Sequence, residues 1–315
     1  MKIAVIGAGG TGGYFGGMLA RAGNDVTFIA RGEHLKAIQR DGLTVKSADK
    51  GDFILTAPAT DQTTDVGPVD LVLFCVKGYH NAGAIPRLKP LVGPETMILS
   101  VQNGIDGERQ IADAVGDEPV LGAIALIAAI IESPGVVAQI GGPGGGMIKF
   151  GELPGGTSPR AERLLAVLND AGINAVLDTD IKLALWDKFV GICAFSGVTS
   201  LTRLPIGPIM DCPETRRLYR STLDEVVALA HAQEIALPEN TADNWIDGMG
   251  RGSRPWVTSS MHHDLKVGRR LELDILNGAA SRLGKELGVP TPANDVIYAA
   301  LAPYASGEPD VPAAP

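Results

Sequence analysis

Three features are scarce or missing in this sequence: cysteine, an excess of positive charge, and any long apolar run. Its three cysteines, Cys75, Cys193 and Cys212, are widely spaced and form no C-x-x-C pair, which argues against a disulfide framework and a zinc site. The formal charge of −9 argues against a nucleic-acid partner, which would require a basic face. The longest apolar stretches, residues 120–131 and 189–201, are shorter than the ~18–20 residues of a membrane span. We therefore expect a cytoplasmic protein without a metal, a membrane or a nucleic-acid partner.

The length of 315 residues, with 45% hydrophobic and 20% charged residues, is typical of a globular protein with two domains. Apolar runs alternate with helical patterns in the first part, and helices follow one another from about residue 180. This predicts an α/β fold: a Rossmann-type, doubly wound parallel sheet over residues 1–178, then an all-α domain over 179–306. The segment 307–315 is rich in proline and alanine, so we expect a flexible tail.

A glycine-rich turn lies between an apolar run, residues 2–6, and a helical pattern. Gly7, Gly9 and Gly12 occupy the three glycine positions of G-x-G-x-x-G. In such a turn the first glycine allows the sharp bend, the second lets a pyrophosphate approach the backbone, and the third lets helix and strand pack closely. The helix N-terminus then offers N–H groups to the phosphates. The pattern predicts a dinucleotide site that includes Gly7, Gly9, Gly10, Thr11 and Gly12.

The end of the second expected strand, residues 26–30, indicates which dinucleotide binds. An NAD site usually has an acidic residue there, which holds the ribose 2′-hydroxyl. This sequence has Arg31 instead, and a guanidinium suits a 2′-phosphate, so we predict NADP(H). Glu33, two residues further on, is the alternative that would serve a hydroxyl group.

Two more apolar runs, residues 69–76 and 96–101, are typical of strands buried on both faces. Lys77 follows the first run and Asn103 follows the second. Ligands of open α/β sheets bind outside the carboxyl ends of the strands. We therefore expect Lys77 and Asn103 at the same edge as the glycine turn. Short segments around residues 43–45 and 53–55 predict strands outside the main sheet.

The helical part has one cation in a strongly apolar setting. After Lys188 there is no charged residue until Arg203. A desolvated lysine has a lowered pKa and can donate a proton near neutral pH, whereas a lysine that reaches water or pairs with an acid has only a structural role. Both interpretations of Lys188 remain open on composition alone.

A second candidate region covers residues 258–278. Ser260 and Asp264 are one helical turn apart, and Glu272 is expected in a helix with a mixed face, where it could orient a substrate or pair with a basic neighbour. His262 and His263 do not form a metal site in this interpretation, because adjacent helical residues point in different directions.

With these motifs in place, the sequence resembles the ketopantoate reductase (2-dehydropantoate 2-reductase) family over nearly its whole length. The matching features are the opening glycine turn, the basic residue after the second strand, a lysine after a buried strand, an Asn-Gly turn, a Leu-Trp-x-Lys helix and a Ser-Ser-Met…Asp…Glu-x-Asp…Asn-Gly pattern. In this chain they are residues 2–13, Arg31, Lys77, 102–104, 185–188 and 259–278.

The resemblance implies NADPH-dependent reduction of a 2-oxo acid, with ketopantoate reduced to pantoate for pantothenate synthesis as the first expectation. It implies that Lys188 protonates the developing alkoxide. Glu272, the second catalytic residue, would hold the hydroxyl side of the substrate, help to place Lys188 and contact the cofactor. Asn103 and Ser260 would position substrate and nicotinamide, and Lys77 would lie by the cofactor. The expected partner is a small 2-oxo acid, with a homodimer as a possible assembly.

One departure from the family pattern affects the expected substrate. Ile192 and Ser196 stand where two substrate-binding asparagines are expected, one and two turns after Lys188. Isoleucine cannot hydrogen-bond a carboxylate or a hydroxyl group, so a bulkier, more apolar 2-oxo acid is the alternative substrate. A non-catalytic dinucleotide-binding protein is the alternative of a different class.

Overall fold

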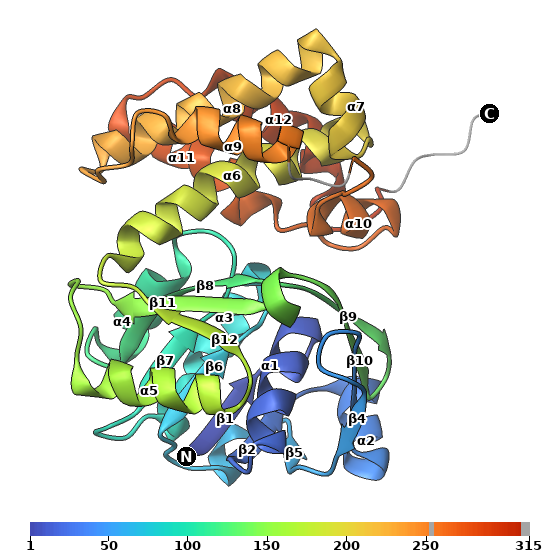
Figure 1. Ribbon diagram of the computed structural model, residues 1–315, viewed down its shortest axis with the longest axis vertical. Helices are drawn as coiled ribbons and strands as arrows, with labels where there is room; N and C mark the ends of the chain where they lie inside the picture. The colour runs from blue at the N-terminus through green and yellow to red at the C-terminus, as the bar shows by residue number, and fades with distance from the viewer. Residues whose placement is uncertain (252–254, 310–315) are drawn as a thin grey trace. The chain divides into compact units, whose positions relative to one another are not determined.

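The computed structural model describes residues 1–251 and 255–309 (Figure 1). The chain divides into two compact units, Met1–Lys182 and Leu183–Pro315, whereas the sequence pattern changes near residue 178. Most of the expected tail, residues 310–315, lies outside the described residues.

The first unit is built on an eight-stranded sheet in the order β12-β11-β8-β7-β6-β1-β2-β5. Its strands are β1 (Lys2–Ile6), β2 (Asp25–Ile29), β5 (Ala59–Thr60), β6 (Leu71–Phe74), β7 (Met97–Ser100), β8 (Val120–Leu126), β11 (Met147–Glu152) and β12 (Asn174–Leu177). Six neighbouring strands, from β8 to β5, are parallel. β11 runs antiparallel to β8 and parallel to β12, so the expected parallel sheet has an antiparallel edge.

Helices cover both faces of this sheet because alternate residues of its central strands point to opposite sides. Val5 and Leu73 belong to the hydrophobic core that includes residues of α1 (Gly10–Arg21) and α5 (Pro159–Asp170). Ile6 and Phe74 belong to the core on the other face. That second core contains residues of α3 (Asn81–Ala84), η3 (Ile85–Leu91) and α4 (Gly107–Val115). The doubly wound α/β prediction is confirmed.

A second, four-stranded sheet in the order β4-β3-β10-β9 lies against α1. Its strands are β3 (Leu43–Ser47), β4 (Phe53–Leu55), β9 (Ala128–Ser133) and β10 (Val136–Gly141), so the prediction of strands outside the main sheet is confirmed. Between the sheets, α1 presents a face of glycines: Gly16 packs against Val5 and Phe28 of the main sheet, and Gly13 packs against Val137 of the small one. Shorter connecting elements are α2 (Gly32–Asp41), η1 (Thr63–Asp65), η2 (Gly78–His80) and η4 (Pro143–Gly145).

The described residues of the second unit form helices joined by loops, with no strand among them. Its elements are α6 (Ile181–Thr202, which begins in the first unit), α7 (Ile206–Asp211), α8 (Pro213–Ala232), α9 (Thr241–Arg251), α10 (Ser260–Lys266), η5 (Leu273–Ile275), α11 (Asn277–Leu287), α12 (Pro292–Leu301) and η6 (Ala302–Tyr304). None of the helices in the described ranges has the length and apolar character that a membrane span requires.

A buried network of side-chain hydrogen bonds connects four of these helices. Asn277 of α11 donates to the Cys193 carbonyl of α6 and to Asn294 Oδ1 of α12, at 3.2 and 2.9 Å. Asn294 Nδ2 donates to Glu225 of α8 at 2.8 Å, and the Glu225 carboxylate also accepts the backbone N–H groups of Ala293 and Asn294 at the start of α12. These bonds fix the position of α6 within its unit.

The expectation that Glu272 lies in a helix is wrong. α10 ends in a Schellman motif: Gly268 has φ = +66°, its N–H bonds to the Leu265 carbonyl, and the Arg269 N–H bonds to the Asp264 carbonyl. The chain therefore leaves the helical path four residues before Glu272, which precedes the short turn η5. Gly268 was the sequence feature that indicated this end.

We predict that Gly16→Ala lowers the free energy of unfolding by about 1–3 kcal/mol, because its Cβ would lie 2.7 Å from both Val5 and Phe28. Urea denaturation measures this effect. The control is Gly83→Ala in α3, where a Cβ has no atom within 4 Å, so stability should change by less than about 1 kcal/mol. Equal losses in both variants would contradict the packing argument.

Candidate functional site

Four loops of the first unit meet at one edge of the main sheet. They follow strands β2, β1, β6 and β7, which are neighbours and parallel, so their carboxyl ends share that edge. The chain order reverses between β1 and β6, which makes this edge the topological switch point of the sheet. The loops carry Gly7, Arg31, Lys77 and Asn103 at the common edge expected from the sequence.

The glycine turn has the geometry that a dinucleotide requires. Gly7 has φ = +92°, and a Cβ there would lie 2.9 Å from Val76. A Cβ on Gly12 would collide with the Gly7 carbonyl oxygen and lie 2.9 Å from Cys75, so both glycines are needed for packing. At Gly9 the nearest atom to a Cβ is 3.9 Å away, so the backbone there is open to a ligand.

The first turn of α1 supplies the donors of this site. Gly9 precedes the helix and has no side chain to cap it, and the N–H groups of Gly10, Thr11 and Gly12 have no acceptor within the helix by geometry. Gly10 has a further role, because a Cβ there would collide with the Ala129 carbonyl of β9. The structure therefore brings together the five predicted residues of the turn in a form that fits a pyrophosphate.

Arg31 is exposed at the end of β2 and precedes α2. Its guanidinium donates to Nε2 of His80 at 2.8 Å, which links the loop after β2 to the loop after β6. Glu33, the alternative residue for a ribose hydroxyl group, forms a 2.8 Å ion pair with Lys36. Sequence reasoning missed His80, because nothing in its neighbours indicates a contact 49 residues away.

A buried amide network holds the loops that carry Lys77 and Asn103, both half-buried. Gln102, only 7% exposed, donates to the Val76 carbonyl and to Asn81 Oδ1, each at 2.7 Å. Asn81 in turn donates to Gln110 of α4 at 2.7 Å. Gln102 thus joins the ends of β6 and β7. Its position beside Asn103 was the only sequence feature that pointed to this role.

His34 joins the glycine turn to the second sheet. One ring nitrogen, Nε2, lies 2.7 Å from the Ala8 carbonyl, and the other, Nδ1, accepts the Gly135 N–H at 3.0 Å. This pairing requires the neutral ring with its proton on Nε2. Burial lowers the pKa of His34, which favours the same form.

In the second unit, α6 has one partly open face. Lys188, Ile192 and Phe195 are spaced by four and three residues, so they lie along one stripe, and all three are half-buried. Ser196, one residue beyond this stripe, is only 1% exposed. The predicted positions Lys188 and Ile192 therefore share a face, and the hydroxyl of Ser196 is turned into the unit.

Trp245 of α9 lies beside this face and was missed from the sequence. Its indole packs on Gly191, where a Cβ would collide with the ring. The indole N–H donates to Asp187 Oδ1 at 3.1 Å, which orients the ring. Glycine is unfavourable inside a helix, so Gly191 was the one sequence feature that could have indicated a close contact at this position.

The two adjacent serines at the start of α10 differ. Ser259 is buried; its Oγ accepts the His262 N–H at 3.0 Å and lies 2.8 Å from Thr199 Oγ1 of α6, so it is structural. Ser260, the predicted site residue, is exposed. Glu272 is 5% exposed and lies in the same unit as Lys188.

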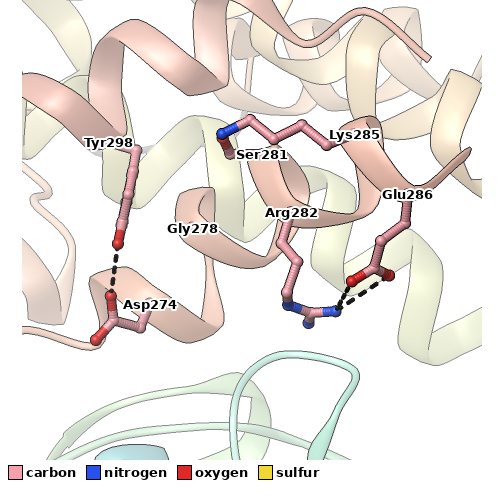
Figure 2. A pocket seen from close by; sticks show the side chains of 7 residues that line it. All are labelled: Asp274, Gly278, Ser281, Arg282, Lys285, Glu286 and Tyr298. Atoms are coloured by element: carbon pink, nitrogen blue, oxygen red, sulfur yellow. Dashed lines mark hydrogen bonds and ion pairs between the residues drawn. The ribbon is translucent and has the colours of Figure 1, made fainter. Parts of the chain in front are cut away.

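A hollow of about 520 Å³ is lined by residues of α11, α12 and η5, and neither Glu272 nor Lys188 lines it (Figure 2). Figure 2 shows two pairs on its wall: Tyr298 donates to Asp274 at 3.1 Å, and Arg282 pairs with Glu286 at 3.4 Å. With Lys285 also on the wall, the two basic and two acidic side chains of the lining balance in charge. In the described ranges, no three His, Cys, Asp or Glu side chains gather as metal ligands.

The switch-point edge with its glycine turn defines a dinucleotide-binding α/β protein with a separate helical unit. The family model described as "Ketopantoate reductase PanE/ApbA" matches residues 3–155, and its C-terminal counterpart matches residues 180–305. The chain belongs to the ketopantoate reductase PanE/ApbA family and is an oxidoreductase of that family.

Individual relatives agree with this assignment. A 2-dehydropantoate 2-reductase of Mesorhizobium japonicum is 29% identical, over 95% of this chain and 96% of the relative. The crystal structure of a PanE/ApbA family ketopantoate reductase from Ralstonia eutropha is 31% identical, with a TM-score of 0.88 over 97% of this chain and 98% of that one. A D-mandelate dehydrogenase, solved with NADH and anilino(oxo)acetate, is 25% identical with the same TM-score and coverage.

We predict that His34 makes the stability of the protein pH-dependent. Because the folded-state pKa lies below the ordinary value of about 6.5, the stabilisation is complete above that pH and is lost as the pH falls through the folded value. Melting temperatures of the wild type and His34→Gln between about pH 5 and 8 test this expectation. The variant should have the weaker pH dependence, and identical slopes would contradict it.

Proposed function

We propose that the protein reduces a 2-oxo acid to the 2-hydroxy acid with NADPH. The observation that carries the proposal is Lys188 on the half-buried face of α6, in a chain whose other unit presents a dinucleotide-binding edge. A protein that only bound a dinucleotide would have no need of a cation in that apolar setting.

The role of Lys188 in this reaction follows from the negative charge that forms on the substrate oxygen. When bound, NADPH would supply a hydride to the carbonyl carbon of the substrate, and negative charge would develop on the carbonyl oxygen. Lys188 stabilises this charge and donates the proton that completes the alcohol. Glu272 and Ser260 would hold the substrate in the helical unit. Asn103 would position substrate and nicotinamide, and Lys77 would lie by the cofactor.

NADPH rather than NADH is favoured by the residues at the end of β2. Arg31 offers a planar, permanently charged group suited to a phosphate. The acidic alternative, Glu33, is paired with Lys36. The NADH in the D-mandelate dehydrogenase structure makes the comparison of both cofactors a necessary part of any assay.

Two substrates deserve a first assay for different reasons. Ketopantoate is indicated by the names of the family and of several relatives. An aromatic 2-oxo acid is indicated by the D-mandelate dehydrogenase, together with the isoleucine at position 192 in place of an asparagine.

We predict that Lys188→Ala lowers kcat by about 10²–10⁴, the usual contribution of a general acid, and leaves NADPH binding intact. Steady-state kinetics and NADPH fluorescence titration measure the two effects. Lys182→Ala, an exposed lysine on the same helix, is the matched control and should keep the wild-type rate. A Lys188→Ala enzyme of normal kcat would refute the assigned role.

We predict that Arg31→Ala raises the Kd for NADPH far more than the Kd for NADH, because only NADPH carries the 2′-phosphate. Arg40→Ala, an exposed arginine on α2, serves as the control and should change neither Kd appreciably. Equal weakening of both cofactors by Arg31→Ala would show that Arg31 does not distinguish them.

A further inference from the structure

Two apolar side chains follow Lys188 along the partly open face of α6. Ile192 follows Lys188 by one helical turn, about 6 Å along the axis, and Phe195 follows by two, about 10 Å. All three lie on the partly open face of α6. A small molecule whose oxygen meets the Lys188 ammonium therefore has these two apolar side chains within reach of its remaining atoms.

Trp245 extends the same surface on the neighbouring side. Its indole carbons Cε2, Cζ2 and Cη2 pack on Gly191, three residues after Lys188. The single polar atom of the ring is already used, because Nε1 donates to Asp187. Trp245 is half-buried, so part of the ring remains accessible.

The hydroxyl groups of Ser196 and Thr199 on α6 are buried and do not line this face. Ser196 is 1% exposed, and the Thr199 hydroxyl donates to the Phe195 carbonyl at 2.6 Å and lies 2.8 Å from Ser259 Oγ. A substrate hydroxyl placed against Ile192 and Phe195 would exchange its hydrogen bonds to water for contact with carbon, which disfavours binding.

We propose that Ile192, Phe195 and Trp245 form an apolar wall that selects 2-oxo acids with an aromatic or branched apolar substituent, in preference to ketopantoate with its 4-hydroxyl group. This inference rests on the proposed function, since it names the substrate class of that reaction. Ile192 and Phe195 contact the substituent, and Trp245 bounds the space beside Lys188.

The test measures kcat and KM with NADPH for phenylglyoxylate and ketopantoate. In the wild type, kcat/KM for phenylglyoxylate should exceed that for ketopantoate by about tenfold or more. Ile192→Asn should lower this ratio by about tenfold or more, as expected when an apolar contact is replaced by a polar one. The change should appear mainly in KM, since the proton donor is untouched.

Two further variants and a control complete the design. Trp245→Ala should lower the ratio as Ile192→Asn does, whereas Trp245→Phe keeps an aromatic surface and should preserve most of it. Leu201→Ala, half-buried on the opposite face of α6, should leave the ratio unchanged. Melting temperatures establish that each variant is folded.

The outcomes separate the inference from the proposed function. A wild type that reduces ketopantoate better than phenylglyoxylate overturns the inference and leaves the reductase activity standing. Folded Ile192→Asn and Trp245→Ala proteins with an unchanged ratio overturn the role of the wall. A wild type that binds NADPH but reduces none of a panel of 2-oxo acids overturns the proposed function, and the inference with it.

Discussion

The close approach of α1 to the main sheet is the constraint on which the first unit depends. Without side chains on Gly12 and Gly16, the helix lies against Val5 and Phe28, and its N-terminus comes directly to the end of β1. The opposite side of α1 is equally crowded, because Gly13 packs on Val137 of the second sheet. One short helix thus serves three purposes: it fills the space between two sheets, it fixes the glycine turn, and it aims its free N–H groups at the ligand edge.

The site in the first unit is held by polar contacts between loops that are distant in sequence. Gln102 ties the end of β7 to the end of β6, Arg31 reaches His80, and His34 connects Ala8 to the turn before β10. Such cross-links reduce the freedom of the loops that meet the cofactor, so less ordering is needed when it binds. In the helical unit, hydrogen bonds of Asn277 and Asn294 likewise hold α6 in position. The face of α6 that carries Lys188 remains partly open.

The family assignment indicates the type of reaction, whereas the side chains around Lys188 bear on the choice of substrate. Membership in the ketopantoate reductase family specifies a reductase, and the residues around Lys188 bear on what is reduced. The half-buried Lys188 shares one face of α6 with Ile192 and Phe195, and Trp245 packs on Gly191 beside that face. The proposed apolar wall would alter the substrate preference and leave the reductase chemistry unchanged, because the fold and the specificity residues are separate features.

Much of the architecture was determined by the sequence itself, because it depends on local patterns. The glycine turn after a short apolar run, the buried strands and the change to helices near residue 180 are all set by side-chain periodicity and backbone freedom. These patterns predicted the main sheet, short strands outside it and the shared edge of Gly7, Arg31, Lys77 and Asn103. Tertiary structure alone decided what depends on distant contacts. It turned β11 antiparallel, paired Arg31 with His80, buried Ser196 and laid Trp245 on Gly191, because packing between remote segments selects each of these arrangements and local periodicity does not encode it.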